Sequence, residues 1–125
     1  MVTEDYVSFE TASLLNEKGF DEEVLAVYIY DNLFVKGENK IVNTANIPII
    51  PAPTLQMAMK WLREVHNIFI VIEPHMYDYI NEKTSSYVTS LWQGDNYYEN
   101  ITSKDYPTYE EAVETALKYS LEYLI

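Results

Sequence analysis

The chain has 125 residues with a formal charge of −12 at pH 7, and it contains no cysteine. Its length suits one domain over residues 1–125, and 48% hydrophobic residues predict a folded core. The negative charge disfavours direct binding to nucleic acids or anionic membranes, because phosphate groups are repelled. Without cysteine, disulfides and thiolate chemistry are excluded. The N-terminus lacks a signal-peptide pattern and no apolar run is long enough to span a membrane, so we expect a soluble cytoplasmic protein.

The first third of the chain predicts one helix and two short strands. Ser8 is a favourable N-cap for a helix over 9–18, and Gly19 follows where a left-handed residue ends a helix. The run 24–30 is β-branched and aromatic, which predicts a largely buried strand. Residues 33–35 predict a second short strand or a continuation of the first.

An extended, proline-containing arm is predicted over 43–53, after a turn at 37–39 and the segment 40–42. Three of the chain's five prolines lie in this arm and prevent a regular helix. The arm is either a connection packed over the core or a recognition segment that docks into a partner or a neighbouring protomer.

The second half predicts two helices around a group of strands. One helix runs from Pro53 or Thr54 to about His66, with Asn67 as its end. The capping box at 108–111 starts the last helix, which continues to the C-terminus. Between them an antiparallel meander is expected, with strands at 68–73, 76–81 and 86–92, a turn at 93–96 and a short edge segment at 97–98.

The predicted order is α-β-β-arm-α-β-β-β-α, which indicates an α+β domain with about three helices on one face of a mainly antiparallel sheet. Its second half has the element order of a double-stranded RNA-binding domain. Such domains hold phosphates with lysine and arginine, whereas residues 95–125 contain seven acids and only two lysines. The charge therefore argues against that function.

The negative charge is concentrated in the two ends of the chain, with a net −6 over 1–23 and −5 over 95–125. If the first and last helices pack side by side, their outer surfaces form one acidic face. That face either keeps the protein solvated, or it mimics a nucleic acid or serves as a docking surface for a basic partner. The candidate residues are Glu10, Glu17, Glu110, Glu114 and Glu122.

No residue pattern indicates an enzyme, a cofactor or a metal. The only histidines, His66 and His75, flank an apolar strand of about five residues. Such a strand spans about 17 Å, so the two imidazoles cannot share an ion within one chain. Nucleophile elbows, phosphate-binding loops and metalloprotease patterns are all missing from the sequence.

Aromatic residues offer an alternative function, which is small-molecule binding. The chain contains 12 tyrosines, which either populate strand faces or form an interaction surface. A pocket between the arm and the sheet could be lined by Trp61, Trp92, Tyr77 and Tyr79.

Three segments of the chain resemble a group of short, uncharacterised proteins of bacterial genomes and their prophages. They are 8–20, 53–64 and the last helix from Tyr109, together about half of the chain. The resemblance implies a cytoplasmic accessory protein of phage or mobile-element type and brings no catalytic residues with it. We therefore expect a non-enzymatic module that binds another protein, with a homodimer as a further expectation.

Overall fold

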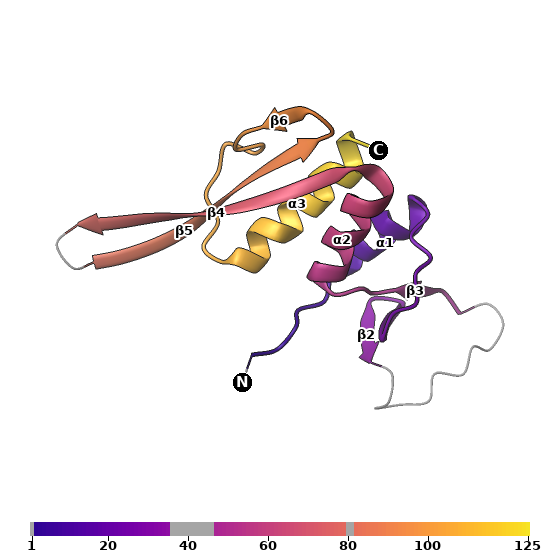
Figure 1. The fold of residues 1–125 in the computed structure, drawn as a ribbon. Coiled ribbons are helices and arrows are strands. Elements are labelled where there is room, and N and C mark those ends of the chain that lie inside the picture. Colours follow the sequence, from indigo (N-terminus) through magenta and orange to yellow (C-terminus); the bar gives the residue numbers. More distant parts are fainter. Residues whose placement is uncertain (1, 36–46, 80–81) are drawn as a thin grey trace.

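A computed structural model of the chain describes residues 2–35, 47–79 and 82–125, of which 76–79 and 82–85 are described by their backbone alone (Figure 1). The α+β class is confirmed, but the strands form two three-stranded antiparallel sheets rather than one. The predicted turn at 37–39, the segment 40–42 and the start of the arm lie outside the described residues. The elements are α1 (Phe9–Glu17), β1 (Ala26–Ile29), β2 (Asn32–Val35), β3 (Ile49–Pro51), α2 (Leu55–His66), β4 (Ile68–Tyr79), β5 (Glu82–Gln93), β6 (Asn96–Tyr98) and α3 (Tyr109–Tyr123).

Helix α1 begins at the predicted residue and ends one residue before the predicted end, with Lys18 as its C-cap. The Ser8 hydroxyl accepts a hydrogen bond from the Thr11 N–H at 3.2 Å, as an N-cap does. At the other end Gly19 has φ +94°, and the N–H of Phe20 donates to the Leu15 carbonyl at 2.9 Å. This Schellman ending brings the buried side chains of Phe20 and Leu15 into the core.

The described part of the arm is a strand of the first sheet. In the order β2-β1-β3, β1 lies in the centre, and β3 pairs with it through Tyr28 opposite Ile50. The sheet is extended by the Ala52 N–H, which donates to the Ala26 carbonyl at 2.9 Å, and both Ala52 and Pro53 are buried. Residues 47–53 are therefore packed against the domain itself.

Helices α2 and α3 are also capped by the predicted residues. The hydroxyl of Thr54 accepts from Met57 N–H at 3.2 Å, and that of Thr108 accepts from Glu111 N–H at 3.1 Å. Asn67 ends α2 in the left-handed conformation, at φ 57°. Each of the two threonine N-caps bonds to the N–H three residues later, so the local sequence is enough to predict where the helix begins.

The second sheet, in the order β4-β5-β6, corrects the predicted meander. The prediction of separate strands at 68–73 and 76–81 was wrong, because β4 continues through Pro74 as one twelve-residue strand. It forms a long hairpin with β5, and the distal half of this hairpin extends beyond the helices (Figure 1).

Pro74 is tolerated because its nitrogen points away from β5. Its partner Tyr87 exchanges two backbone hydrogen bonds of 2.8 Å with Tyr106, so the N–H and C=O of Tyr87 point away from β4. In an antiparallel pair, a residue opposite such a position directs its own backbone groups to the outer side. The missing N–H of Pro74 thus costs no bond between the strands.

One buried cluster joins both sheets and all three helices. Helix α3 packs across β4 and β5, α2 packs against β4 and α3, and α1 packs against α3 and β3. The cluster includes Ala26 and Tyr28 of the first sheet with Ile68 and Leu91 of the second. Within the described residues, no helix is long and apolar enough to cross a membrane.

Candidate functional site

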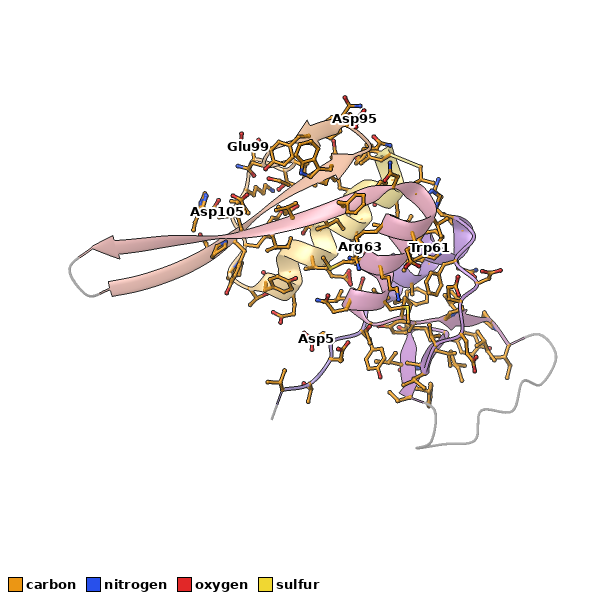
Figure 2. The ribbon with its side chains drawn as sticks, viewed as in Figure 1. Asp5, Trp61, Arg63, Asp95, Glu99 and Asp105 are labelled. Atoms are coloured by element: carbon orange, nitrogen blue, oxygen red, sulfur yellow. The ribbon has the colours of Figure 1, made fainter. Side chains whose placement is uncertain are left out.

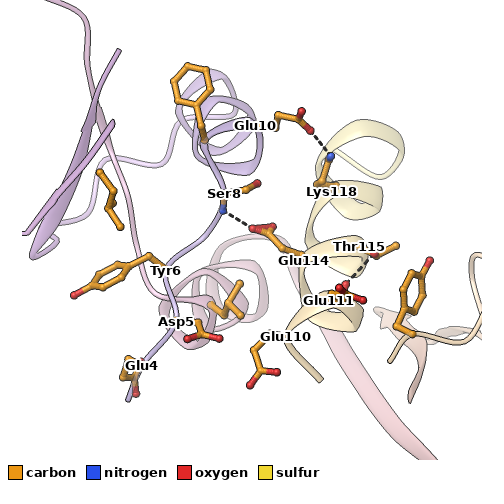
Figure 3. Close-up of a pocket in the computed structure, with 14 residues that line it drawn as sticks. Glu4, Asp5, Tyr6, Ser8, Glu10, Glu110, Glu111, Glu114, Thr115 and Lys118 are labelled. Carbon is orange, nitrogen blue, oxygen red and sulfur yellow. Dashed lines mark hydrogen bonds and ion pairs between the residues drawn. The ribbon is translucent and has the colours of Figure 1, made fainter. Parts of the chain in front are cut away.

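A groove of about 900 Å³ opens between the N-terminal segment, the start of α1 and the first turns of α3 (Figure 3). We call it the acidic groove. Among the described residues, its lining carries six carboxylates but one lysine, Lys118, so the electrostatic potential of this lining favours cations. The carboxylates are those of Glu4, Asp5, Glu10, Glu110, Glu111 and Glu114.

The N-terminal segment is held in place by backbone bonds to the start of α2. Val7 N–H donates to the Pro53 carbonyl at 3.0 Å, and Leu55 N–H donates to the Asp5 carbonyl at 2.9 Å. The second bond satisfies one of the first amides of α2, which has no partner inside the helix. These bonds place Asp5 beside the groove (Figure 3).

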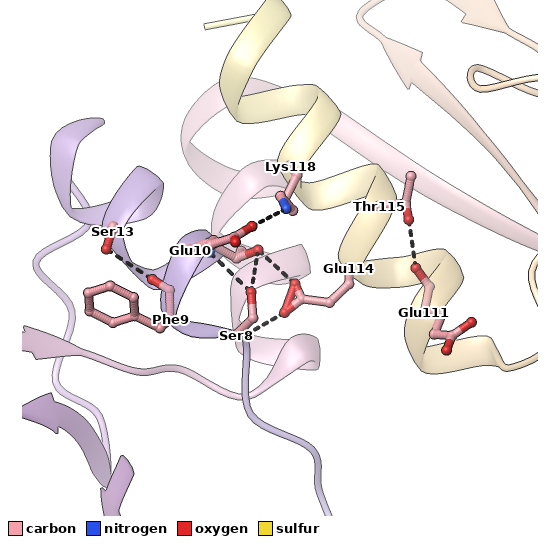
Figure 4. A network of polar contacts seen from close by, with 9 residues as sticks. Ser8, Phe9, Glu10, Ser13, Glu111, Glu114, Thr115 and Lys118 are labelled. Carbon is pink, nitrogen blue, oxygen red and sulfur yellow. Dashed lines mark hydrogen bonds and ion pairs between the residues drawn. The ribbon is translucent and has the colours of Figure 1, made fainter. Parts of the chain in front are cut away.

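Glu114 is the residue that joins α1 to α3 (Figure 4). Its carboxylate accepts hydrogen bonds from the Ser8 N–H and, at 2.7 Å, from the fully buried Thr11 hydroxyl. A carboxylate is favoured there because the N-terminal end of a helix carries partial positive charge. Glu114 therefore points into the helix interface and not outward as a simple acidic face requires.

Lys118, the one base among the described lining residues, is paired with Glu10 across α1 and α3 (Figure 4). This hydrogen bond raises the pKa of Lys118 and lowers the pKa of Glu10. Glu10 is largely exposed, so the pair adds little to stability. Its main effect is to neutralise the cation of the groove and leave the remaining carboxylates in excess.

Apolar side chains complete the groove. Leu55 at the start of α2 is buried, whereas Phe9 and Leu33 are more than a third exposed. Tyr6 and Tyr106 contribute two further partly buried rings. The groove therefore combines negative charge with apolar surface.

Of the five acids expected on one face, the structure brings three to the groove. These are Glu10, Glu110 and Glu114, whereas Glu17 and Glu122 are exposed at the other ends of their helices. Sequence reasoning missed the contribution of Glu4, Asp5 and Glu111. The sequence shows that the N-terminus and the first turn of the last helix are acidic. That these two segments lie close together depends on the backbone bonds between the N-terminal segment and the start of α2.

Other acids lie away from the groove. Figure 2 shows Asp95 and Glu99 near β6, at the opposite end of the domain from Asp5. Neither of them lines the groove. The groove is therefore a local concentration of charge, and not the only place where the acids of the two chain ends lie.

The four aromatic residues of the alternative pocket are not brought together by the described contacts. Trp61 is 5% exposed and contacts Phe20 and His66 edge-on, with ring centroids 5.5 and 4.7 Å apart. Trp92 is 43% exposed on the second sheet, where its ring lies 4.8 Å from that of Tyr97. The side chains of Tyr77 and Tyr79 lie outside the described residues.

The two histidines have separate surroundings. His66 ends α2 beside Trp61, whereas Nδ1 of His75 lies 3.4 Å from Oδ2 of Asp105. Asp105 also accepts a hydrogen bond of 3.0 Å from the Ser86 hydroxyl. In the described part of the chain, no group of three or more histidine, aspartate or glutamate side chains is placed to hold a metal ion.

Tyr28 connects the first sheet to the N-terminal segment. Its hydroxyl donates to the Val7 carbonyl at 2.7 Å, and burial together with the charge of Glu114 raises its pKa. We expect Tyr28→Phe to lower the free energy of unfolding by about 1–2 kcal/mol, because a buried carbonyl loses its donor.

The raised pKa makes this difference depend on pH. The stabilisation is complete below the ordinary tyrosine value of 10.0 and is lost as the pH rises through the higher folded value. We expect the difference in the free energy of unfolding between the unmodified chain and Tyr28→Phe, measured with urea, to be largest at neutral pH and to decrease above pH 10.0. A difference in unfolding free energy that stays constant with pH would contradict the assignment of the hydrogen bond with Val7 to the protonated hydroxyl of Tyr28.

Comparison with protein-family models, curated proteins and solved structures finds no match to this chain.

Proposed function

We propose that the chain is a non-enzymatic interaction module whose acidic groove binds a basic, amphipathic segment of a partner protein. The observation that carries the proposal is the combination of six carboxylates with apolar side chains in one groove. Charge complementarity speeds encounter and selects the partner, and apolar contact supplies affinity.

The charges available to a partner are those that the fold does not use. Glu114 is bound to α1, and Glu10 is paired with Lys118. Four carboxylates remain, all on exposed residues, and they point to a ligand with several positive charges. They belong to Glu4, Asp5, Glu110 and Glu111.

The apolar lining favours a peptide over a simple cation. Phe9 and Leu33 would be partly covered by apolar side chains of a bound segment, while its lysines or arginines contact the rim. A segment in which basic and apolar residues alternate on one face meets both requirements.

The cytoplasmic location and the accessory role in a phage or mobile element also belong to this proposal. They are supported by the resemblance of three sequence segments and by the acidic composition. Under the proposal this protein does not bind DNA or RNA through the groove, because the groove and a phosphate backbone are both negatively charged.

A binding assay with a defined probe tests the proposal. The probe is a fluorescent amphipathic helical peptide of lysine and leucine, and its counterpart has glutamate in place of lysine. Fluorescence anisotropy should show saturable binding of the lysine peptide at about 50 mM salt and weaker binding at about 300 mM, because salt screens exposed charges. The glutamate peptide should not bind.

Matched charge reversals distinguish the groove from overall charge. Glu110→Lys with Glu111→Lys changes two groove residues, and Glu17→Lys with Glu122→Lys makes the same net change at exposed positions outside it. We expect the groove variant to raise the dissociation constant about tenfold or more and the control to change it less than about twofold. Equal effects of the two variants, or no binding by the unmodified chain, would refute the proposal.

A further inference from the structure

The outer edge of β4 presents backbone groups that no described residue pairs with. Among the described strands, whose order in this sheet is β4-β5-β6, β4 is bonded on one side only. Its residues Ile70 and Ile72 lie opposite Leu91 and Thr89 of β5. The Thr89 carbonyl accepts from Ile101 at 2.9 Å, on the side away from β4. By the alternation of antiparallel pairs, Ile70 and Ile72 direct their N–H and C=O groups to the outer edge.

This open edge is short and uncharged. Asn67 ends α2 on one side of it, and Pro74, which lacks an N–H, limits it on the other. Between them lies an apolar run of five residues, Ile68–Ile72, in a chain whose net charge is −12. An uncharged window is where a second copy of so acidic a chain meets least repulsion.

We propose that two copies of this chain pair antiparallel along the edges of β4, with Ile70 opposite Ile70 of the second copy. This register places Ile68 opposite Ile72, so all outward backbone groups of the window meet one another. Three such residue pairs supply about six hydrogen bonds between the copies. Glu73 would then lie opposite the uncharged Asn67, so no two like charges are directly opposed.

Side chains on the two faces fit the same register. Ile70 and Ile72, on the helix side, are only partly buried in the single chain and would be covered further. On the other face, Phe69 is 42% exposed and would lie opposite Val71 of the second copy. Phe69 already continues a cross-strand row with Trp92 and Tyr97, which pairing would extend into the second chain.

Amide hydrogen exchange measured by NMR at low and high protein concentration tests the edge directly. Ile70 and Ile72 should gain about tenfold or more protection as the concentration rises. Phe69 and Val71, whose N–H groups are directed to β5, should not change and serve as internal controls. Unchanged exchange at Ile70 and Ile72 would overturn the proposal.

Sedimentation equilibrium with paired variants tests the register. The mass should rise with concentration from 14.6 kDa towards twice that value. Phe69→Lys and Val71→Glu should each raise the dimer dissociation constant about tenfold. A mixture of the two should recover part of the affinity, because lysine then faces glutamate. Failure of the mixture to recover would overturn this register.

Trp92→Lys provides the matched control. It removes an aromatic side chain of similar exposure from the same face, but on the central strand β5. Circular dichroism melting confirms that each variant is folded, and Trp92→Lys should leave the dimer intact. Dissociation by Trp92→Lys as strong as by Phe69→Lys would show that the sheet face, not the edge, forms the contact, and would refute the proposal.

Discussion

Replacing Trp61 by alanine is expected to lower the free energy of unfolding by about 3–5 kcal/mol, the usual cost of removing a large buried aromatic side chain. Trp61 is 5% exposed and joins α2 to the segment after α1 through its edge contact with Phe20. The alanine variant leaves a space that these elements cannot close without moving. Urea unfolding followed by circular dichroism measures the change.

Trp92→Ala is the matched control for this prediction. Trp92 is 43% exposed and contacts Tyr97 on the open face of the second sheet. We expect this variant to cost less than about 1.5 kcal/mol, because water already reaches much of the ring. If Trp61→Ala cost as little as Trp92→Ala, the contacts of Trp61 would not be those of a core residue.

The helix ends could be predicted because each depends on a few neighbouring residues. Ser8, Thr54 and Thr108 each cap a helix through an N–H three positions later, and Gly19 and Asn67 end helices by their own conformation. None of these interactions requires knowledge of the rest of the chain. These helix ends separate the three helices from the strands between them, and the α+β assignment depended on that separation.

The continuity of β4 could not be predicted from its sequence. A proline breaks a strand only if its missing N–H faces a paired neighbour. At Pro74 that side is decided by Tyr87, whose backbone bonds go to Tyr106. The relevant residues are more than ten and thirty positions away, beyond any local pattern.

The candidate site depends on long-range contacts in the same way. Composition showed that both ends of the chain are acidic, but only the bonds of the N-terminal segment to Pro53 and Leu55 bring Asp5 near Glu110. Likewise, Trp61 and Trp92 are similar as sequence features, and tertiary packing gives one to the core and the other to the surface. The sequence therefore showed which side chains could take part in binding, but only the tertiary contacts showed which of them lie together.

Glu114→Ala is expected to lower the free energy of unfolding by about 2–3 kcal/mol, although glutamate on a helix surface is usually replaceable at little cost. Its carboxylate is the acceptor for the Ser8 N–H and for the hydroxyl of Thr11, which is fully buried. Without it, the buried Thr11 hydroxyl loses its acceptor. Urea unfolding at neutral pH measures the loss.

Glu110→Ala separates these hydrogen bonds from the effect of charge. Glu110 lies four residues earlier on the same helix, lines the same groove and is exposed. Its removal should change the unfolding free energy by less than about 0.5 kcal/mol. In a double-mutant cycle, Thr11→Val should remove much of the cost of Glu114→Ala, because the buried donor is then absent. Additive effects would mean that the cost of Glu114→Ala does not arise from the Thr11 hydroxyl, and would contradict the role given to that hydrogen bond.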